Sequence, residues 1–134
     1  MANKPELNDG GCMCGDVRYR LYGPFTYSAN CHCRSCQRAV GAGVATYSAV
    51  APENFEILKG KMAIYESSPG VRRGFCSKCG TSLSYAGDDW TDYAIHSATL
   101  DNPGRAVPTS NVYLDEKQPW IALDDTLKRF AKFP

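Results

Sequence analysis

Seven cysteines stand in three short groups of this 134-residue chain. The groups read CMC at 12–14, CHCRSC at 31–36 and CSKCG at 76–80. Thiolates are favoured ligands of structural zinc, and four of them close a tetrahedron around the ion. Because the number of cysteines is odd, they cannot all be paired in internal disulfides. Their type and spacing predict metal binding.

The CMC and CSKCG groups together supply four sulfurs, the number that a closed zinc site requires. Side chains alternate between the two faces of an extended segment, so Cys12 and Cys14 can point at one ion while Met13 points away. CSKCG resembles a zinc knuckle, in which Gly80 can take the left-handed conformation after the turn. A redox dithiol is the alternative for CSKCG, but no βαβ thioredoxin pattern surrounds it. The ligands expected at this structural zinc are Cys12, Cys14, Cys76 and Cys79.

The CHCRSC group leaves three further sulfurs on one short loop, those of Cys31, Cys33 and Cys36. Three protein ligands can hold a second zinc and leave its fourth position open, which is the mark of a catalytic or ligand-exchanging site. We therefore expect a catalytic zinc here. A purely structural ion, closed by His32, an aspartate or water, is one alternative. Another is that the 12–14 group shares an ion with Cys31 and Cys33.

Basic residues flank two of the cysteine groups. Arg34 and Arg38 adjoin the three-cysteine loop, where they can offset thiolate charge or attract a carboxylate of a substrate, so they are candidates for substrate binding. His32 lies between two ligands and is expected to face away from the metal, toward solvent or the ligands' neighbours. Arg72, Arg73 and Lys78 flank the CSKCG group and are expected to be solvated charges that offset thiolates, with attraction of a substrate carboxylate as the alternative.

Composition indicates a folded domain, with 43% hydrophobic and 22% charged residues. No apolar run reaches the roughly 20 residues that span a bilayer, and the first residues lack the apolar core of a secretory signal. We therefore expect a cytoplasmic protein with no membrane partner. The formal charge of +1, which thiolate–zinc binding would make mildly acidic, gives no reason to expect nucleic-acid binding.

Short apolar runs, punctuated by glycine and proline, predict a mainly β fold. We expect one domain of short antiparallel strands over residues 10–134, preceded by a polar segment over residues 1–9. A helical turn is expected to open residues 52–58, and a short terminal helix is expected over residues 124–131. Strands are expected at 17–23, 43–50, 62–67, 80–87 and 92–100.

Five motifs, in this order, resemble the glutathione-dependent formaldehyde-activating enzyme family, which centromere protein V shares. They are GGCMCGDVRY, CHCRSCQRAVGAG, GFCSKCGTSLSY, HSATLDNP and YLDEKQPW. The resemblance covers roughly residues 10 to 120 and implies a zinc-stabilised β-tent fold with the structural and catalytic zinc sites divided as above. It also implies a histidine where this chain has Asn111. If that histidine transfers protons, this chain lacks a general base, because an amide does not titrate.

The resemblance implies a carbon–sulfur lyase that joins glutathione to formaldehyde as S-(hydroxymethyl)glutathione. We therefore expect an enzyme that uses two zinc ions and acts on the adduct of a small thiol, such as glutathione, with a small aldehyde. The alternative is a non-catalytic zinc module that binds a small thiol or a protein partner. A chromatin or cytoskeletal role, suggested by the centromere relative, is disfavoured because the sequence has no long basic extension.

Overall fold

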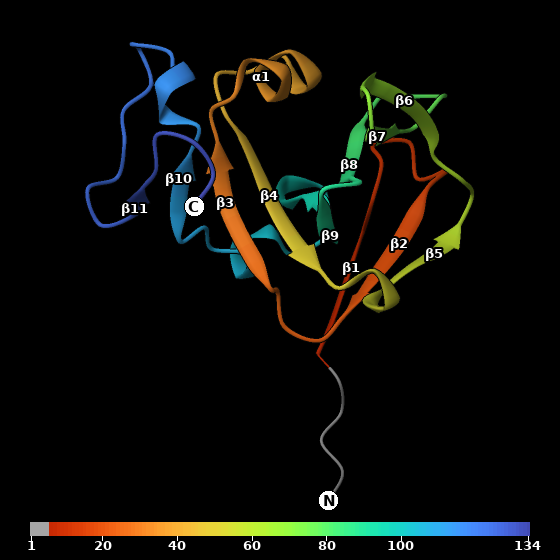
Figure 1. Ribbon diagram of the computed structural model, residues 1–134. Coiled ribbons are helices and arrows are strands. Elements are labelled where there is room, and N and C mark those ends of the chain that lie inside the picture. The colour runs from red at the N-terminus through yellow and green to blue at the C-terminus, as the bar shows by residue number, and fades with distance from the viewer. Residues whose placement is uncertain (1–5) are drawn as a thin grey trace, which may run out of the picture.

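Two β-sheets organise the protein in a computed structural model that describes residues 6–134 (Figure 1). The smaller sheet has the order β1 (Leu7–Gly11), β2 (Arg18–Tyr22), β5 (Phe55–Lys59). The larger sheet has the order β11 (Lys128–Arg129), β10 (Ser110–Val112), β3 (Tyr27–Cys31), β4 (Ala45–Val50), β9 (Trp90–His96), β8 (Ser82–Gly87), β7 (Val71–Phe75), β6 (Ala63–Ser68). All pairings are antiparallel except those of β10 with β3 and β11, which are parallel.

Short helices connect these strands. The α-helix α1 (Arg34–Val40) follows β3 directly and lies at the top of Figure 1. Single 3-10 turns occupy η1 (Pro52–Asn54), η2 (Ser97–Thr99), η3 (Pro103–Arg105) and η4 (Leu114–Glu116). Among residues 6–134, no helix combines the length and the apolar character needed to cross a membrane.

Strand β2 shows how the sequence pattern produces the layers. Tyr19 and Leu21 are fully buried, whereas Arg18 and Arg20 on the opposite face stay partly exposed. The exposed face is not left unpaired, because the Arg20 Nε donates to Asp9 Oδ1 of the neighbouring strand at 2.7 Å. This alternation buries one face of the small sheet against the large one, as its period of two predicts.

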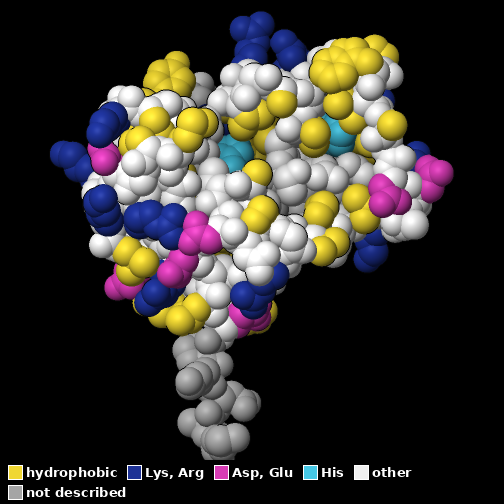
Figure 2. All heavy atoms as spheres, turned by 180° about the vertical axis from the view of Figure 1, so that it is seen from behind, with side chains coloured by type: hydrophobic (Ala, Val, Ile, Leu, Met, Phe, Trp, Pro, Cys, Tyr) yellow, Lys and Arg dark blue, Asp and Glu magenta, His cyan; other side chains and the backbone are white. Residues whose placement is uncertain are grey.

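Two clusters of buried side chains hold the domain together. The first lies between the sheets and contains Tyr19, Leu21, Val50, Leu83 and Ile95. The second covers the other face of the large sheet and includes two of the cysteines, Cys31 and Cys36. On the outside, charges of both signs are interspersed with apolar side chains over the face shown in Figure 2.

The expected mainly β, single-domain fold is confirmed, and each expected strand overlaps a strand of the structure. The strand expected over 92–100 ends at His96, where η2 begins. Of the expected polar N-terminal segment, residues 1–5 lie outside the described residues, and residues 7–9 belong to β1.

The terminal helix expected over residues 124–131 is wrong. Asp124 instead closes a turn by accepting the Thr126 N–H at 2.8 Å, and the chain then runs as β11 beside β10. There the Phe130 N–H donates to the Asn111 carbonyl at 2.9 Å. The free backbone groups of a sheet edge thus bind this segment, and a short isolated helix is marginal on its own.

Candidate functional site

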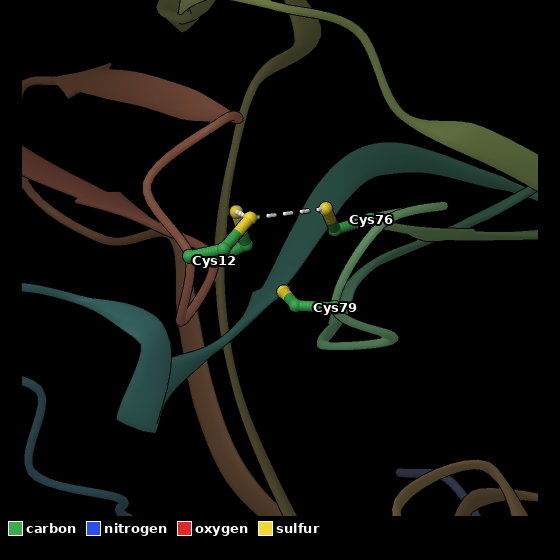
Figure 3. Close-up of side chains that lie close together, drawn as sticks. Cys12, Cys76 and Cys79 are labelled. Atoms are coloured by element: carbon green, nitrogen blue, oxygen red, sulfur yellow. Dashed lines mark hydrogen bonds between the residues drawn. The ribbon is translucent and has the colours of Figure 1, made fainter.

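Four cysteine sulfurs converge where the two sheets approach each other. Cys12 and Cys14 follow β1 of the small sheet, and Cys76 and Cys79 follow β7 of the large one. Their sulfurs all lie within 4.8 Å of one another. Figure 3 shows Cys12 facing Cys76 and Cys79, which extend from a separate segment. The structure therefore brings together the four cysteines that the sequence assigns to one ion.

Local backbone geometry aims these sulfurs inward. Gly80 has φ 78°, the left-handed conformation expected after the knuckle, and its N–H donates to the Cys76 carbonyl at 2.8 Å. Met13 is 89% exposed and points away, as alternation along the chain predicts. Hydrogen bonds from the Thr81 side chain and backbone lower the pKa of the Cys79 thiol to about 5, which favours a thiolate ligand.

The spacing of these sulfurs fits a tetrahedral metal ion. Metal–sulfur bonds of about 2.3 Å give a regular tetrahedron with edges of about 3.8 Å. The Cys12–Cys14 and Cys14–Cys76 sulfur pairs are 3.6 and 3.8 Å apart. The cluster can therefore hold an ion such as zinc with no ligand beyond its own four sulfurs.

The other three cysteines gather at a strand-to-helix junction. Cys31 ends β3, Cys33 is the N-cap of α1, and Cys36 lies in the first helical turn. The Cys36 N–H donates to the Cys33 sulfur at 3.3 Å, and the Cys31 and Cys36 sulfurs are 3.4 Å apart. All three sulfurs lie within 4.8 Å of one another, so they form a second candidate metal site and do not join the first.

Residues 34–40 form helix α1, although the sequence predicted a short loop around these cysteines. The sequence does carry a signal for it, since good helix formers follow Cys36 and Gly41 ends the run. In the structure Gly41 has φ 66° and its N–H donates to the Gln37 carbonyl at 2.8 Å. The helix fixes the Cys33 and Cys36 sulfurs three residues apart on one face.

A cavity of about 640 Å³ opens over the three-sulfur cluster. Its floor includes the three cysteines, and six of its other lining residues are aromatic. The aromatic residues that line it are Tyr27, Tyr47, Tyr85, Trp90, Tyr113 and Phe133. Because protein pockets of a few hundred cubic ångströms bind small molecules, this cavity is the candidate substrate site.

Arg73 enters this cavity from β7, although the sequence predicted a solvated charge there. Its guanidinium nitrogens lie 3.8 Å from the Cys36 sulfur, and Nη1 donates to the Tyr47 hydroxyl at 3.2 Å. The Tyr47 hydroxyl donates in turn to the Cys36 sulfur at 3.4 Å. The guanidinium also lies over the Tyr85 ring, 5.1 Å from its centroid.

These contacts shift the pKa values of Cys36 and Tyr47 in opposite directions. Hydrogen bonds from Cys31 and Cys33, with smaller contributions from Tyr47 and Arg73, lower the pKa of the Cys36 thiol well below its usual value. Burial raises the pKa of Tyr47 far above its usual value, so its hydroxyl stays protonated. The Cys36 sulfur, the Arg73 guanidinium and the Tyr47 hydroxyl therefore lie side by side in the cavity, where both neighbours favour the thiolate form of Cys36.

Comparisons with known proteins agree with this arrangement. Residues 7–116 match the family of the glutathione-dependent formaldehyde-activating enzyme. The chain belongs to the glutathione-dependent formaldehyde-activating enzyme family. It is 27% identical over 141 residues to a Halomonas elongata protein provisionally named as such an enzyme, a comparison that covers 96% of this chain and 89% of the relative. A Rhodobacter sphaeroides protein of known crystal structure shares the fold, with a TM-score of 0.58, 22% identity, and coverage of 69% of this chain and 87% of that one.

The family match contains all seven cysteines and Arg73 but ends before Phe133, which completes the cavity wall.

The two arginines that the sequence suggested for substrate binding, Arg34 and Arg38, lie outside the cavity over the cysteines. Arg34 donates from its backbone N–H to Glu116 and from its side chain to Gln37. Arg38 lines a separate cavity of about 450 Å³, which Arg73 also borders. Neither Arg34 nor Arg38 lines the cavity over the cysteines, and substrate binding by them stays a prediction.

His32 and Asn111 face each other away from the cavity. The His32 Nε2 lies 3.0 Å from Asn111 Oδ1, and their residues are 1% and 2% exposed. The His32 backbone is anchored as well, because its carbonyl accepts from Gln37 Nε2. His32 is not among the residues that cluster with the three sulfurs, and it packs in the interior against Asn111 and has almost no solvent contact. The Asn111 side chain does not line the cavity, so it is not placed to act on a ligand there.

His96 makes folding sensitive to acid. Burial lowers its pKa from 6.5 to about 4, and its ring packs 4.5 Å from the Tyr47 ring, centroid to centroid. Because the unfolded chain binds this proton below pH 6.5 and the folded chain does not, stability falls as the pH drops from 6.5 to about 4. We expect a loss of about 2 kcal/mol at pH 5 from this residue alone.

Urea unfolding at pH 7 and pH 5 measures this loss. His96→Gln removes the titration, so its free energy of unfolding should fall less between the two pH values than that of the unsubstituted protein. Both proteins keep the same seven cysteines, so protonation of the thiols affects them equally. An identical fall in both proteins would rule His96 out as the acid-sensitive group.

Proposed function

We propose that this protein is a zinc-dependent carbon–sulfur lyase-type enzyme that forms and cleaves the adduct of a small thiol, such as glutathione, with a small aldehyde, in the cytoplasm. The product with formaldehyde would be S-(hydroxymethyl)glutathione. The observation that carries the proposal is the contrast between the two cysteine clusters. Four sulfurs complete a tetrahedron among themselves, whereas three sulfurs face a cavity that holds Arg73.

In this proposal Cys12, Cys14, Cys76 and Cys79 bind a structural zinc, and Cys31, Cys33 and Cys36 bind the catalytic one. A zinc ion with an open position lowers the pKa of a bound thiol or polarises a carbonyl oxygen. The cavity supplies the room for both reactants. The protein's own task is then to orient the aldehyde and to balance the charge that develops on its oxygen.

Adduct formation makes one carbon–sulfur bond and moves one proton. The thiol releases its proton to solvent, its sulfur gives an electron pair to the aldehyde carbon, the carbon–oxygen π bond opens, and the oxygen takes up a proton from solvent. Arg73 has guanidinium N–H groups beyond the one that it donates to the Tyr47 hydroxyl, so it can bind that oxygen as it becomes negative, while Tyr47 holds the guanidinium beside Cys36. In the reverse direction the same oxygen loses its proton and the carbon–sulfur bond breaks.

Calorimetry with glutathione and S-methylglutathione tests the proposal. Both compounds carry the same charged groups, but the methylated sulfur cannot become a thiolate. We expect glutathione to bind at least about tenfold more tightly, with release of a proton, because a thiolate is the form that metals bind. Equal affinities would show that the thiol is not bound through the metal.

A non-catalytic thiol-binding module is the second candidate. It is favoured by the composition of the cavity, since the described residues that line it include no histidine to act as a general base. Formaldehyde consumption in the presence of glutathione distinguishes the two candidates. An enzyme accelerates the reaction above its spontaneous rate at catalytic protein concentration, whereas a binding module only removes thiol in proportion to its own amount.

A further inference from the structure

We propose that the cavity over Cys31, Cys33 and Cys36 selects a substrate that carries an aromatic ring, on either the thiol or the aldehyde. This inference rests on the proposed function and names its substrate class. It is carried by three features of the cavity: the pairing of large and small residues across the strands, the packing of the aromatic wall, and the scarcity of positive charge.

The first feature is a regular alternation on one face of the large sheet. Four aromatic residues each stand directly across from alanine or glycine on the neighbouring strand. The pairs are Tyr27 with Ala49, Tyr47 with Ala29, Tyr85 with Ala94, and Trp90 with Gly87. Such partners share a face about 5 Å apart, so each ring borders a site with almost no side chain. Of the four small residues, Ala94 and Gly87 line the cavity, so they leave space there beside the rings of Tyr85 and Trp90.

The second feature is that these rings are held in place before any ligand arrives. The Trp90 ring packs edge-on against Tyr27 at 5.7 Å and against Phe133 at 6.3 Å, centroid to centroid. It also lies 6.2 Å from Tyr85. Centroid separations of 4.5–7 Å are favoured by aromatic pairs, and an incoming ring can add further contacts of the same kind.

Tyr113, which also lines the cavity, has a strained backbone conformation. It has φ 56° and ψ 41°, and it is the only non-glycine residue among residues 6–134 with positive φ. A bulky residue in this conformation is strained, and glycine would fit at no such cost. The strained backbone places a ring on the cavity wall directly after β10, beside Cys31 and Cys33.

The third feature is electrostatic. Arg73 is the one cation among the described residues that line the cavity, and it already contacts Cys36 and Tyr47. The other charged lining residues are the carboxylates Asp88 and Asp89, both exposed. Binding in this cavity therefore depends little on a ligand's negative charge, and a neutral ring can contact the six aromatic lining residues. A one-carbon aldehyde by itself would leave most of the roughly 640 Å³ unfilled.

The test compares the zinc-loaded protein's binding of benzyl mercaptan, 1-propanethiol and benzyl alcohol. Calorimetry gives the affinities, and tryptophan fluorescence in a Trp120→Phe background reports on Trp90, since the chain has two tryptophans. We expect benzyl mercaptan to bind at least about tenfold more tightly than 1-propanethiol. Benzyl alcohol should perturb the Trp90 emission although it has no thiol.

Two variants locate the ring. Ala94→Leu fills the space beside the Tyr85 ring and should remove the preference for benzyl mercaptan while 1-propanethiol still binds. Ala86→Leu is the matched control, because Ala86 is on the same strand pair but does not line the cavity. The Ala86→Leu variant should prefer benzyl mercaptan over 1-propanethiol as strongly as the unsubstituted protein does.

Equal affinities for the two thiols, or an unchanged preference in Ala94→Leu, would overturn the inference and leave the proposed thiol chemistry standing. The opposite failure has a different signature. If neither thiol binds through the metal but benzyl alcohol still perturbs Trp90 in a manner that Ala94→Leu abolishes, the ring site stands and the proposed function does not.

Discussion

Replacing Cys76 with serine is expected to lower the melting temperature by about 10 °C or more. Cys76 is 2% exposed and belongs to the four-sulfur cluster, in which Cys12 and Cys14 follow β1 of the small sheet while Cys76 and Cys79 follow β7 of the large one. A metal there ties the small sheet to the large one, and metal binding of this kind contributes directly to the free energy of folding. A loss of only about 3 kcal/mol gives this shift in a domain of 134 residues.

Cys33→Ser is the matched control for this prediction. Cys33 is the N-cap of α1, and serine is a preferred N-cap residue, so the helix keeps its cap. Its cluster lies within one sheet and its adjoining helix, and it does not join the two sheets. We therefore expect a folded protein that melts within a few degrees of the original and binds thiols poorly.

Thermal melts and metal analysis of both variants decide between the roles. The unsubstituted protein should hold about two zinc ions, and Cys33→Ser should lose the three-sulfur site first, because a three-coordinate site with an open position exchanges its ion more readily. If Cys33→Ser melts as early as Cys76→Ser, both clusters are structural. A single ion in the unsubstituted protein would contradict the division into two sites.

The chemistry of the cysteines was the most predictable part of the site. Ligand type and spacing are local properties, so alternation in CMC and the turn at Gly80 follow from backbone geometry alone. Strand β2 was also predictable, because Tyr19 and Leu21 alternate with Arg18 and Arg20 and only the first pair is buried, whereas its neighbours β1 and β5 were not among the expected strands. These features depend on residues within one short segment.

Features that depend on distant segments were not visible. β11 forms because it can pair with β10, a segment almost 20 residues away, and its own sequence favours a helix. Arg73 looks like a solvated charge beside Arg72, yet alternation on β7 sends only Arg73 into the cavity. A strand assignment at 71–75 and its register with Tyr85 would have been needed to predict that placement.

Arg73→Gln is expected to lower kcat/KM for adduct formation by about a hundredfold. The guanidinium is held at the cavity floor by the Tyr47 hydroxyl and by the Tyr85 ring, where it can donate to the aldehyde oxygen as that oxygen becomes negative. Removing one donor from such a position typically costs a factor of about 10² to 10³ in kcat. Arg73→Lys keeps the charge but loses the planar fork, so it should retain part of the activity.

Arg38→Gln provides the control, because Arg38 borders only the separate smaller cavity. It should change kcat/KM by less than about threefold, and that change should shrink in high salt, as expected for an exposed charge. Metal content and melting temperature of Arg73→Gln should stay close to those of the unsubstituted protein, which separates a role in catalysis from one in folding. If Arg38→Gln and Arg73→Gln reduce activity equally, the arginines act only through their long-range charge, and the aldehyde oxygen is not bound at Arg73.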